Sequence, residues 1–145
     1  MSKSDDLENE MLEHILNNAD IANIGDATGL RGSTADGSLY VSLHTADPTD
    51  SGDQTSSEIA YTGYSRVAIA RTGSAWTVTA NSASPASAIT FPAGTGGSGT
   101  ATHFGIGTDS TGTGKLLYSG TVTPNIVCGD GVTPQLTTAT AITEA

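Results

Sequence analysis

The spacing of the hydrophobic residues changes at about residue 37 of the chain. Before this point, five apolar side chains recur at the intervals of one helical face. These are Leu7, Met11, Leu12, Ile15 and Leu16. Ser4, Asp5 and Asp6 can cap the first turn and suit its positive dipole end, and Asn17 and Asn18 tolerate the left-handed backbone at which helices commonly end. The pattern therefore predicts a helix over residues 5 to 17.

The segment from residue 19 to residue 37 follows neither a helical nor a strand period. It is rich in Gly, Asp, Ser and Thr, and its apolar residues Ile21, Ile24 and Leu30 are isolated. Such a composition is typical of loops. We therefore predict an N-terminal helix and irregular arm over residues 1 to 37, followed by a separate domain over residues 38 to 145.

After Gly37 the hydrophobic period becomes two. Leu39, Val41 and Leu43 alternate with more polar residues, so one side of a strand is expected to be buried. Further strands are predicted at 65 to 71, 75 to 79, 88 to 91, 101 to 107, 115 to 123, 125 to 128 and 135 to 143. Short strands separated by Gly, Pro, Asn and Asp, with no second helical pattern, indicate an antiparallel sandwich or barrel.

In either architecture the protein is expected to be mainly β. Its core is predicted from the alternating apolar positions of the strands. The predicted core residues are Leu39, Val41, Leu43, Val67, Ile69, Trp76, Val78, Ile89, Phe91, Phe104, Ile106, Leu116 and Leu117.

The charge balance argues against direct nucleic-acid binding. The 145 residues carry a formal net charge of −10, and the five basic residues are scattered along the chain, so no positive stripe can follow a phosphate backbone. No apolar stretch has the length of a membrane span or of a signal peptide. The chain is therefore expected to stay in the cytosol in which it is made, unless another component carries it out.

The stretch "LHTADPTDSGD" brings three carboxylates and a histidine close together in the sequence. Counted from Asp47, oxygen-bearing residues and Glu58 fall at the positions of a calcium-binding EF-hand loop. However, hydroxyls replace two of the usual carboxylates, Pro48 stiffens the start, and a strand leads into the loop. A turn whose Asp side chains accept backbone N–H groups is favoured; calcium binding by residues 47 to 58 stays open.

Two glycine motifs resemble nucleotide-binding loops without their context. "GTGGSG" at 94 to 99 has the spacing of a dinucleotide fingerprint, but a strand is predicted after it where a helix is required. "GTGK" at 112 to 115 is followed by Leu116 where a P-loop needs Ser or Thr. Neither motif predicts a cofactor, and we expect none.

The histidines and the cysteine offer little for catalysis. His14, His44 and His103 lie in three different elements without metal-ligand spacing, and a histidine on the polar side of a strand is usually partly exposed. Cys128 is the single cysteine, which excludes an intrachain disulfide. Paired with a histidine it could act as a nucleophile, so a small hydrolase is the alternative function from another class. No catalytic or metal-binding residue is predicted.

The order of five segments resembles a family of small virion proteins of tailed bacteriophages. The segments are "LENEMLEHIL", "LYVSLHTADP", "GYSRVAIAR", "ITFP" and "THFGIGTDSTGTGKLLYSG". Members are variously described as capsid cement or decoration proteins and as tail-fibre-like proteins. The resemblance implies a mainly β fold in which a short N-terminal helix and arm precede an antiparallel β-sandwich of the jelly-roll kind, and so favours the sandwich over the barrel. It also implies a structural protein instead of an enzyme.

The resemblance also implies where the protein acts. A cement protein would lie on the outer capsid surface of the virion after synthesis in the host cytoplasm, tying neighbouring major capsid protein subunits together and contacting copies of itself. A tail, neck or tail-fibre structural protein is the alternative from the same resemblance.

The apolar face of the predicted helix is the candidate partner-binding surface. Residues 1 to 37 have too few apolar residues for a second core, so Leu7, Met11, Leu12, Ile15 and Leu16 need another surface to cover them. That surface can belong to a capsid subunit, to a second copy, or to the sandwich of the same chain.

Overall fold

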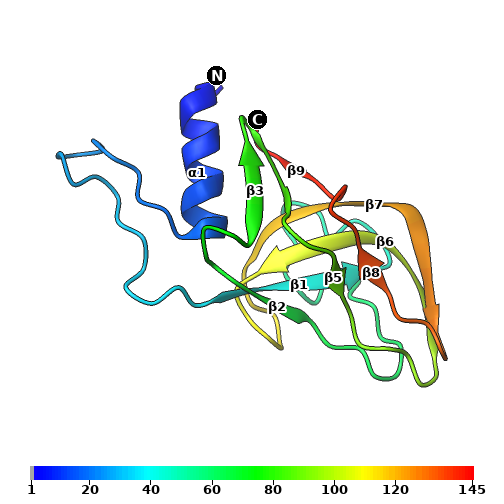
Figure 1. The fold of residues 1–145 in the computed structure, drawn as a ribbon. Coiled ribbons are helices and arrows are strands. Elements are labelled where there is room, and N and C mark those ends of the chain that lie inside the picture. The colour runs from blue at the N-terminus through cyan, green and yellow to red at the C-terminus, as the bar shows by residue number, and fades with distance from the viewer. Residues whose placement is uncertain (1) are drawn as a thin grey trace. The chain divides into compact units, whose positions relative to one another are not determined.

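The chain forms two units, each built from separate stretches of sequence (Figure 1). We analysed a computed structural model, which describes residues 2 to 145. The first unit comprises the residues up to Ser38 together with Ala70–Ser87 and Thr138–Ala145. The second unit comprises Leu39–Ile69 and Ala88–Thr137. The division of the chain into domains at residues 37 and 38 stays a prediction.

The first unit begins with the helix that the sequence predicts. Helix α1 spans Asp5–Asn17. The hydroxyl of Ser4 accepts a hydrogen bond from the backbone N–H of Leu7 at 3.3 Å, and Asn18 ends the helix in the left-handed conformation, with φ of 59°. The capping residues and the helix bounds are therefore confirmed.

Helix α1 packs against strands of its own unit, namely β3 (Trp76–Thr79) and β4 (Ser82–Pro85). Strands β3, β4 and β9 (Ile142–Thr143) form a three-stranded antiparallel sheet. The side chain of the buried Asn17 donates to the carbonyl of Trp76 at 2.9 Å and accepts from its N–H at 3.1 Å. This pair of bonds fastens the end of the helix to the start of β3.

Arg71 satisfies the carbonyl groups at the C-terminal end of α1. Its Nε donates to the carbonyl oxygen of Ile15 at 2.6 Å and its Nη2 to that of His14 at 2.7 Å. The last carbonyls of a helix have no partner within the helix, and a cation beside them also suits the helix dipole. Arg71 is 54 or more residues away in sequence, so only the tertiary structure supplies this cap.

The arm between α1 and β1 is irregular, as predicted, but it is held by specific bonds. Ile21 and Leu30 exchange two backbone hydrogen bonds of 2.8 Å each. At the base of the arm, the amide of Asn18 accepts from the N–H of Ser33 and donates to its carbonyl. Ile24 and Leu30 stay exposed, whereas Ile21 is buried, so hydrogen bonds and a single apolar anchor hold the arm.

The second unit contains a four-stranded sheet in the order β2-β1-β6-β7. These strands span Val67–Ala70 (β2), Ser38–His44 (β1), Ser98–Gly107 (β6) and Leu116–Gly129 (β7). The pairs β1–β6 and β6–β7 are antiparallel, with Leu43 opposite Phe104 and Phe104 opposite Gly120. Strands β5 (Ile89–Thr90) and β8 (Gln135–Leu136) form a separate antiparallel pair.

Eight of the thirteen predicted core residues are buried. These are Leu39, Val41, Leu43, Trp76, Ile89, Phe91, Phe104 and Ile106. The other five are partly exposed: Val67, Ile69, Val78, Leu116 and Leu117. Ile59, Tyr61 and Leu136 are also buried, although they lie outside the alternating patterns from which the core was predicted.

The predicted strands differ from the observed ones at three places. Strand β7 continues through Pro124, where the sequence predicted two strands. The proline is tolerated because β7 is an edge strand and its register with β6 shifts near Pro124. Residues 135 to 143 form β8 and β9 in different sheets instead of one strand, because Leu136 and Ile142 are paired with different partners. Strand β4, "SASP", gave no signal, since its small residues have low strand propensity.

The fold class is confirmed as mainly β, with antiparallel sheets and one short N-terminal helix. Within the described residues no helix has both the length and the apolar character needed to cross a membrane.

Candidate functional site

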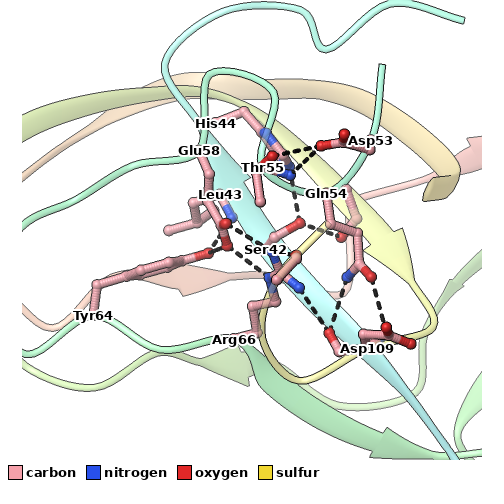
Figure 2. A network of polar contacts seen from close by, with 12 residues as sticks. Ser42, Leu43, His44, Asp53, Gln54, Thr55, Glu58, Tyr64, Arg66 and Asp109 are labelled. Atoms are coloured by element: carbon pink, nitrogen blue, oxygen red, sulfur yellow. Dashed lines mark hydrogen bonds and ion pairs between the residues drawn. The ribbon is translucent and has the colours of Figure 1, made fainter. Parts of the chain in front are cut away.

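A network of polar side chains in the second unit surrounds an ion pair between Glu58 and Arg66 (Figure 2). Nε of Arg66 donates to Oε1 of Glu58 at 2.7 Å, and Nη2 donates to Oε2 at 2.8 Å. This is the two-point geometry in which a guanidinium matches a carboxylate. The Arg66 side chain is 3% exposed and that of Glu58 is 16% exposed, so water screens the pair weakly.

Tyr64 links this ion pair to the central sheet. Its hydroxyl donates to Oε1 of Glu58 at 2.8 Å and accepts from the backbone N–H of Leu43 in β1 at 3.1 Å. Its ring stacks on Phe91, with 6.3 Å between the ring centroids. Burial raises the pKa of Tyr64 far above its ordinary value, and the nearby carboxylate of Glu58 raises it further. The phenol is therefore neutral and connects β1 to the ion pair through hydrogen bonds.

Arg66 also holds the loop between β6 and β7. Nη1 donates to the carbonyl oxygen of Asp109 at 2.8 Å, and Nη2 donates to that of Gly112 at 2.7 Å. One guanidinium thus joins Glu58, which lies in the segment between β1 and β2, to the loop between β6 and β7. Both contacts fix the loop backbone, and the Asp109 carboxylate takes no part in them.

Gln54 makes a second link to the same loop. Its side chain accepts from the N–H of Asp109 at 2.9 Å and donates to the Asp109 carbonyl at 3.2 Å. It is completely buried. Room for it exists because its neighbours are glycines: a Cβ on Gly107 would lie 2.2 Å from Cδ of Gln54, and one on Gly114 would lie 2.0 Å from its Oε1.

Ser42 and His44 form a pair that resembles part of a catalytic triad. The Ser42 hydroxyl lies 2.8 Å from Nε2 of His44, and Nδ1 of His44 lies 2.8 Å from the carbonyl oxygen of Ser56. Nδ1 therefore carries the proton that the carbonyl accepts, and Nε2 accepts from Ser42. Burial lowers the pKa of His44 below its ordinary value, which keeps the ring neutral.

The buried position of this pair rules out a role as a nucleophile in the folded chain. Ser42 and His44 are both 0% exposed, so no substrate can reach the hydroxyl. The expectation that His44 lies partly exposed on a polar strand side is wrong. The reason is Gly105, which lies opposite Ser42 in β6 and has no side chain, so that both polar groups fit inside the unit.

The acidic loop after β1 forms a series of turns, which is the structure that its residue types favoured over a calcium loop. Oδ1 of Asp47 accepts from the N–H of Thr49 at 2.9 Å, and Oδ1 of Asp53 accepts from the N–H and the hydroxyl of Thr55. The hydroxyl bond is the main cause that lowers the pKa of Asp53. The last position of the calcium-like spacing is Glu58, and its carboxylate is already in an ion pair with Arg66. Across residues 2 to 145 the structure groups no three metal-ligating side chains at one place.

Cys128 has the environment of a structural thiol. It is 1% exposed, and burial raises the pKa of the thiol. A nucleophilic cysteine needs the opposite shift and access to solvent. Its Sγ donates to the carbonyl oxygen of Ile126 at 3.6 Å.

An open pocket of about 230 Å³ lies beside the ion pair. It is lined by Glu58, Tyr64, Ser65, Arg66, Ser110, Thr111 and Gly112. The charged groups at its wall already bind each other, so the pocket presents hydroxyl groups and no activated acid, base or nucleophile. The arrangement stabilises two loops and has no evident chemistry of its own.

The candidate partner-binding residues of α1 divide into two sets. Leu12 and Leu16 are 0% exposed, in a helix that contacts β3 and β4 of its own unit. Leu7, Met11 and Ile15 are only partly buried. The three partly exposed residues therefore form the part of the stripe that another protein can reach, and we call them the outer stripe of α1.

No sequence pattern pointed directly to the network around Arg66. Arg66 lies in the strand predicted at 65 to 71, whereas Glu58, Tyr64 and Asp109 lie between predicted strands. The glycines of "FGIG" were the available clue, because two glycines at alternate positions of a strand leave space on one side of it.

A comparison with protein families finds a match over most of the chain. The sequence profile of the family described as "Podophage GP4 fiber I protein gp80" matches residues 2 to 141, which is nearly the whole chain. A search of curated proteins finds no match.

Proposed function

Because the chain belongs to the podophage GP4 fiber I protein gp80 family, we propose that it is a structural subunit of a fiber on a phage particle. The family is one of phage virion fiber proteins and not of enzymes, so the chain is a virion structural protein. The match over residues 2 to 141 is the observation that carries this conclusion. The hydrolase alternative is set aside, since the family is structural and Cys128 is buried.

Of the two virion functions implied by the sequence resemblance, the fiber function is favoured over the capsid cement function. The matching family is described as a fiber protein, whereas a cement protein would cover the head lattice. The polar network around Arg66 suits a fiber subunit, because it fastens loops by paired internal bonds and so gives them a fixed shape.

The outer stripe of α1 is the proposed attachment surface. Leu7, Met11 and Ile15 are partly exposed, and their neighbours Leu12 and Leu16 anchor the helix to its own unit. A rigidly held helix with an accessible apolar stripe can insert into a groove of a neighbouring virion protein. The occupant of the stripe is then the protein at the base of the fiber.

Labelling of intact particles tests the fiber function. Gold-conjugated antibodies against this chain should mark fibers projecting from the particle, and its copy number by quantitative mass spectrometry should be a small multiple of the symmetry of the attachment site. Labels spread evenly over the head, with a copy number that follows the number of capsid subunits, would instead establish the cement function.

Two sets of helix variants test the attachment surface. Alanine at Leu7, Met11 and Ile15 together should reduce incorporation into particles and change the melting temperature little. Leu12→Ala is the matched control: it should lower stability by about 2–5 kcal/mol, as for other buried leucines. Normal incorporation of the triple variant would remove the outer stripe from the attachment surface.

A further inference from the structure

The pocket beside the Glu58–Arg66 ion pair has the size of a site for one small ring. Its volume of about 230 Å³ equals that of about eight water molecules in the liquid. Pockets for drug-sized ligands begin at about 300 Å³, so this pocket has room for a smaller molecule. All of its lining residues belong to the second unit.

Three hydroxyl side chains at this pocket have no partner in the protein. Ser65, Ser110 and Thr111 are exposed and line the pocket. Within residues 2 to 145 no other group forms a hydrogen bond with these three side chains. A hydroxyl group can donate one hydrogen bond and accept two. The pocket therefore offers donors and acceptors that the chain does not use internally.

The backbone that carries two of these hydroxyls is fixed from below. The carbonyls of Asp109 and Gly112, on either side of the two hydroxyl residues, accept from Arg66 at 2.8 Å and 2.7 Å. The buried Gln54 binds both backbone groups of Asp109. Residues 108 to 113 are all exposed, so no apolar core orders this loop. Fixing a loop before a ligand arrives lowers the entropy that binding costs.

The charges at the pocket favour a neutral ligand. Both carboxylate oxygens of Glu58 accept from Arg66, so the two charges at the wall compensate each other. An anion would meet a guanidinium that is already paired, in a chain of net charge −10. A metal cation would find no group of three ligating side chains anywhere in residues 2 to 145. The remaining class is a neutral molecule that carries hydrogen-bonding groups of its own.

Tyr64 is the aromatic residue among the lining residues. Its ring is held in place by stacking on Phe91 and by the two hydrogen bonds of its hydroxyl. Tyr, Ser and Gly are the residue types with which binding surfaces combine a rigid aromatic contact and adaptable hydrogen bonds. A sugar ring matches both features, because it has C–H groups on its faces and hydroxyl groups around its edge.

We propose that this pocket binds a neutral sugar ring through the hydroxyl groups of Ser65, Ser110 and Thr111. The hydroxyls of the ring exchange hydrogen bonds with these side chains, and a C–H face of the ring packs beside Tyr64. The bound molecule is held and not chemically changed, since the acid and the base at the wall bind each other. This inference does not depend on the fiber function.

Titration of the purified full chain with methyl glycosides tests the proposal. The probes are the methyl glycosides of glucose, galactose, mannose and N-acetylglucosamine, and binding is measured from the amide shifts in NMR spectra. At least one probe should bind, with the shifts confined to residues around the pocket. Thr111→Val keeps the shape of the side chain but removes its hydroxyl, and should raise the Kd about threefold to tenfold.

The matched control is Thr113→Val, which makes the same change in the same loop but outside the pocket lining. It should leave the Kd unchanged. Ser110→Trp fills the pocket and should abolish binding, while the melting temperature stays near that of the wild type because the residue is exposed. Inorganic phosphate should not displace a bound glycoside.

Methyl glycosides and the matching disaccharides separate the two sources of such a ring. Equal binding of both supports a sugar unit within a glycan, and binding of the methyl glycoside alone supports a free sugar. Absence of binding by all four probes, displacement of a bound glycoside by phosphate, or equal effects of Thr111→Val and Thr113→Val would each overturn the proposal.

Discussion

Replacing Arg66 by methionine should destabilise the second unit strongly. Methionine fills a similar volume but leaves the Glu58 carboxylate, 16% exposed, without its cation. Removal of one partner from a buried ion pair typically costs about 3–5 kcal/mol. The Asp109 and Gly112 carbonyls that Arg66 also binds lie in exposed residues, where water can replace the lost donors. The expected loss in the free energy of unfolding is therefore near the lower end of this range, about 3 kcal/mol.

Urea unfolding followed by far-ultraviolet circular dichroism measures this loss. Trp76, the single tryptophan, belongs to the first unit, so its fluorescence does not report directly on the network. For a chain of this size about 3 kcal/mol corresponds to a fall of roughly 10 °C in the melting temperature. Arg66→Lys keeps the charge but loses the two-point contact, so its melting temperature should lie between those of the wild type and Arg66→Met.

Arg31→Met is the matched control, since it removes the same side chain from an exposed ion pair. Nη1 of Arg31 lies 3.5 Å from Oδ2 of Asp20, with side chains 69% and 48% exposed, and such pairs contribute about 1 kcal/mol at most. The double variant Glu58→Gln with Arg66→Met should be more stable than Arg66→Met alone, because no buried charge is then unpaired. If Arg66→Met costs no more than Arg31→Met, the ion pair does not fasten the loops and the reasoning is refuted.

Three further predictions concern single buried positions. Burial lowers the pKa of His44 below its ordinary 6.5, so on acidification the unfolded chain binds a proton before the folded chain does. The free energy of unfolding should therefore fall as the pH drops through 6.5 toward the lowered pKa of His44 in the folded chain. His44→Gln should flatten this dependence in urea unfolding between about pH 7.5 and 5, and an unchanged slope would contradict the assignment. Gly107→Ala should cost about 1–3 kcal/mol by displacing Gln54 from its bonds to Asp109, measured against Gly73→Ala, whose added Cβ meets nothing within 4 Å. Cys128 should resist Ellman's reagent in the folded chain and react fully in urea, since its thiol is buried and its pKa is raised; rapid reaction without denaturant would show that the strand opens.

The sequence by itself determined the elements whose signals are local. Helix α1 was predicted with its bounds because its apolar spacing, its Ser4 cap and its Asn18 terminus all act within a few residues. Strand β1 followed from the alternation of Leu39, Val41 and Leu43. The rejection of "GTGGSG" as a nucleotide loop was also local, because a strand was predicted at 101 to 107; β6 covers that range but begins earlier, at Ser98.

The tertiary structure alone decided the partners of polar and short segments. Arg66 and Glu58 lie eight positions apart in the sequence, and Arg66 then reaches a loop beyond β6; no spacing in the sequence encodes these contacts. Arg71 caps a helix that ends more than fifty residues earlier, which no local pattern can reveal. Strand β4 forms because β3 and β9 pair with it on either side, although its own residues have a low strand propensity.

The burial of His44 shows most clearly where local reasoning ends. Alternation along β1 correctly separated its two sides, but it assigned the side of Ser42 and His44 to solvent. Whether a polar side faces water depends on what the neighbouring strand and loops place over it. Gly105 in β6 leaves the space, and the Ser56 carbonyl and the Ser42 hydroxyl supply the hydrogen bonds that the ring loses with water. Burial of a polar group is favourable only when such partners converge, and their convergence is a property of the folded chain.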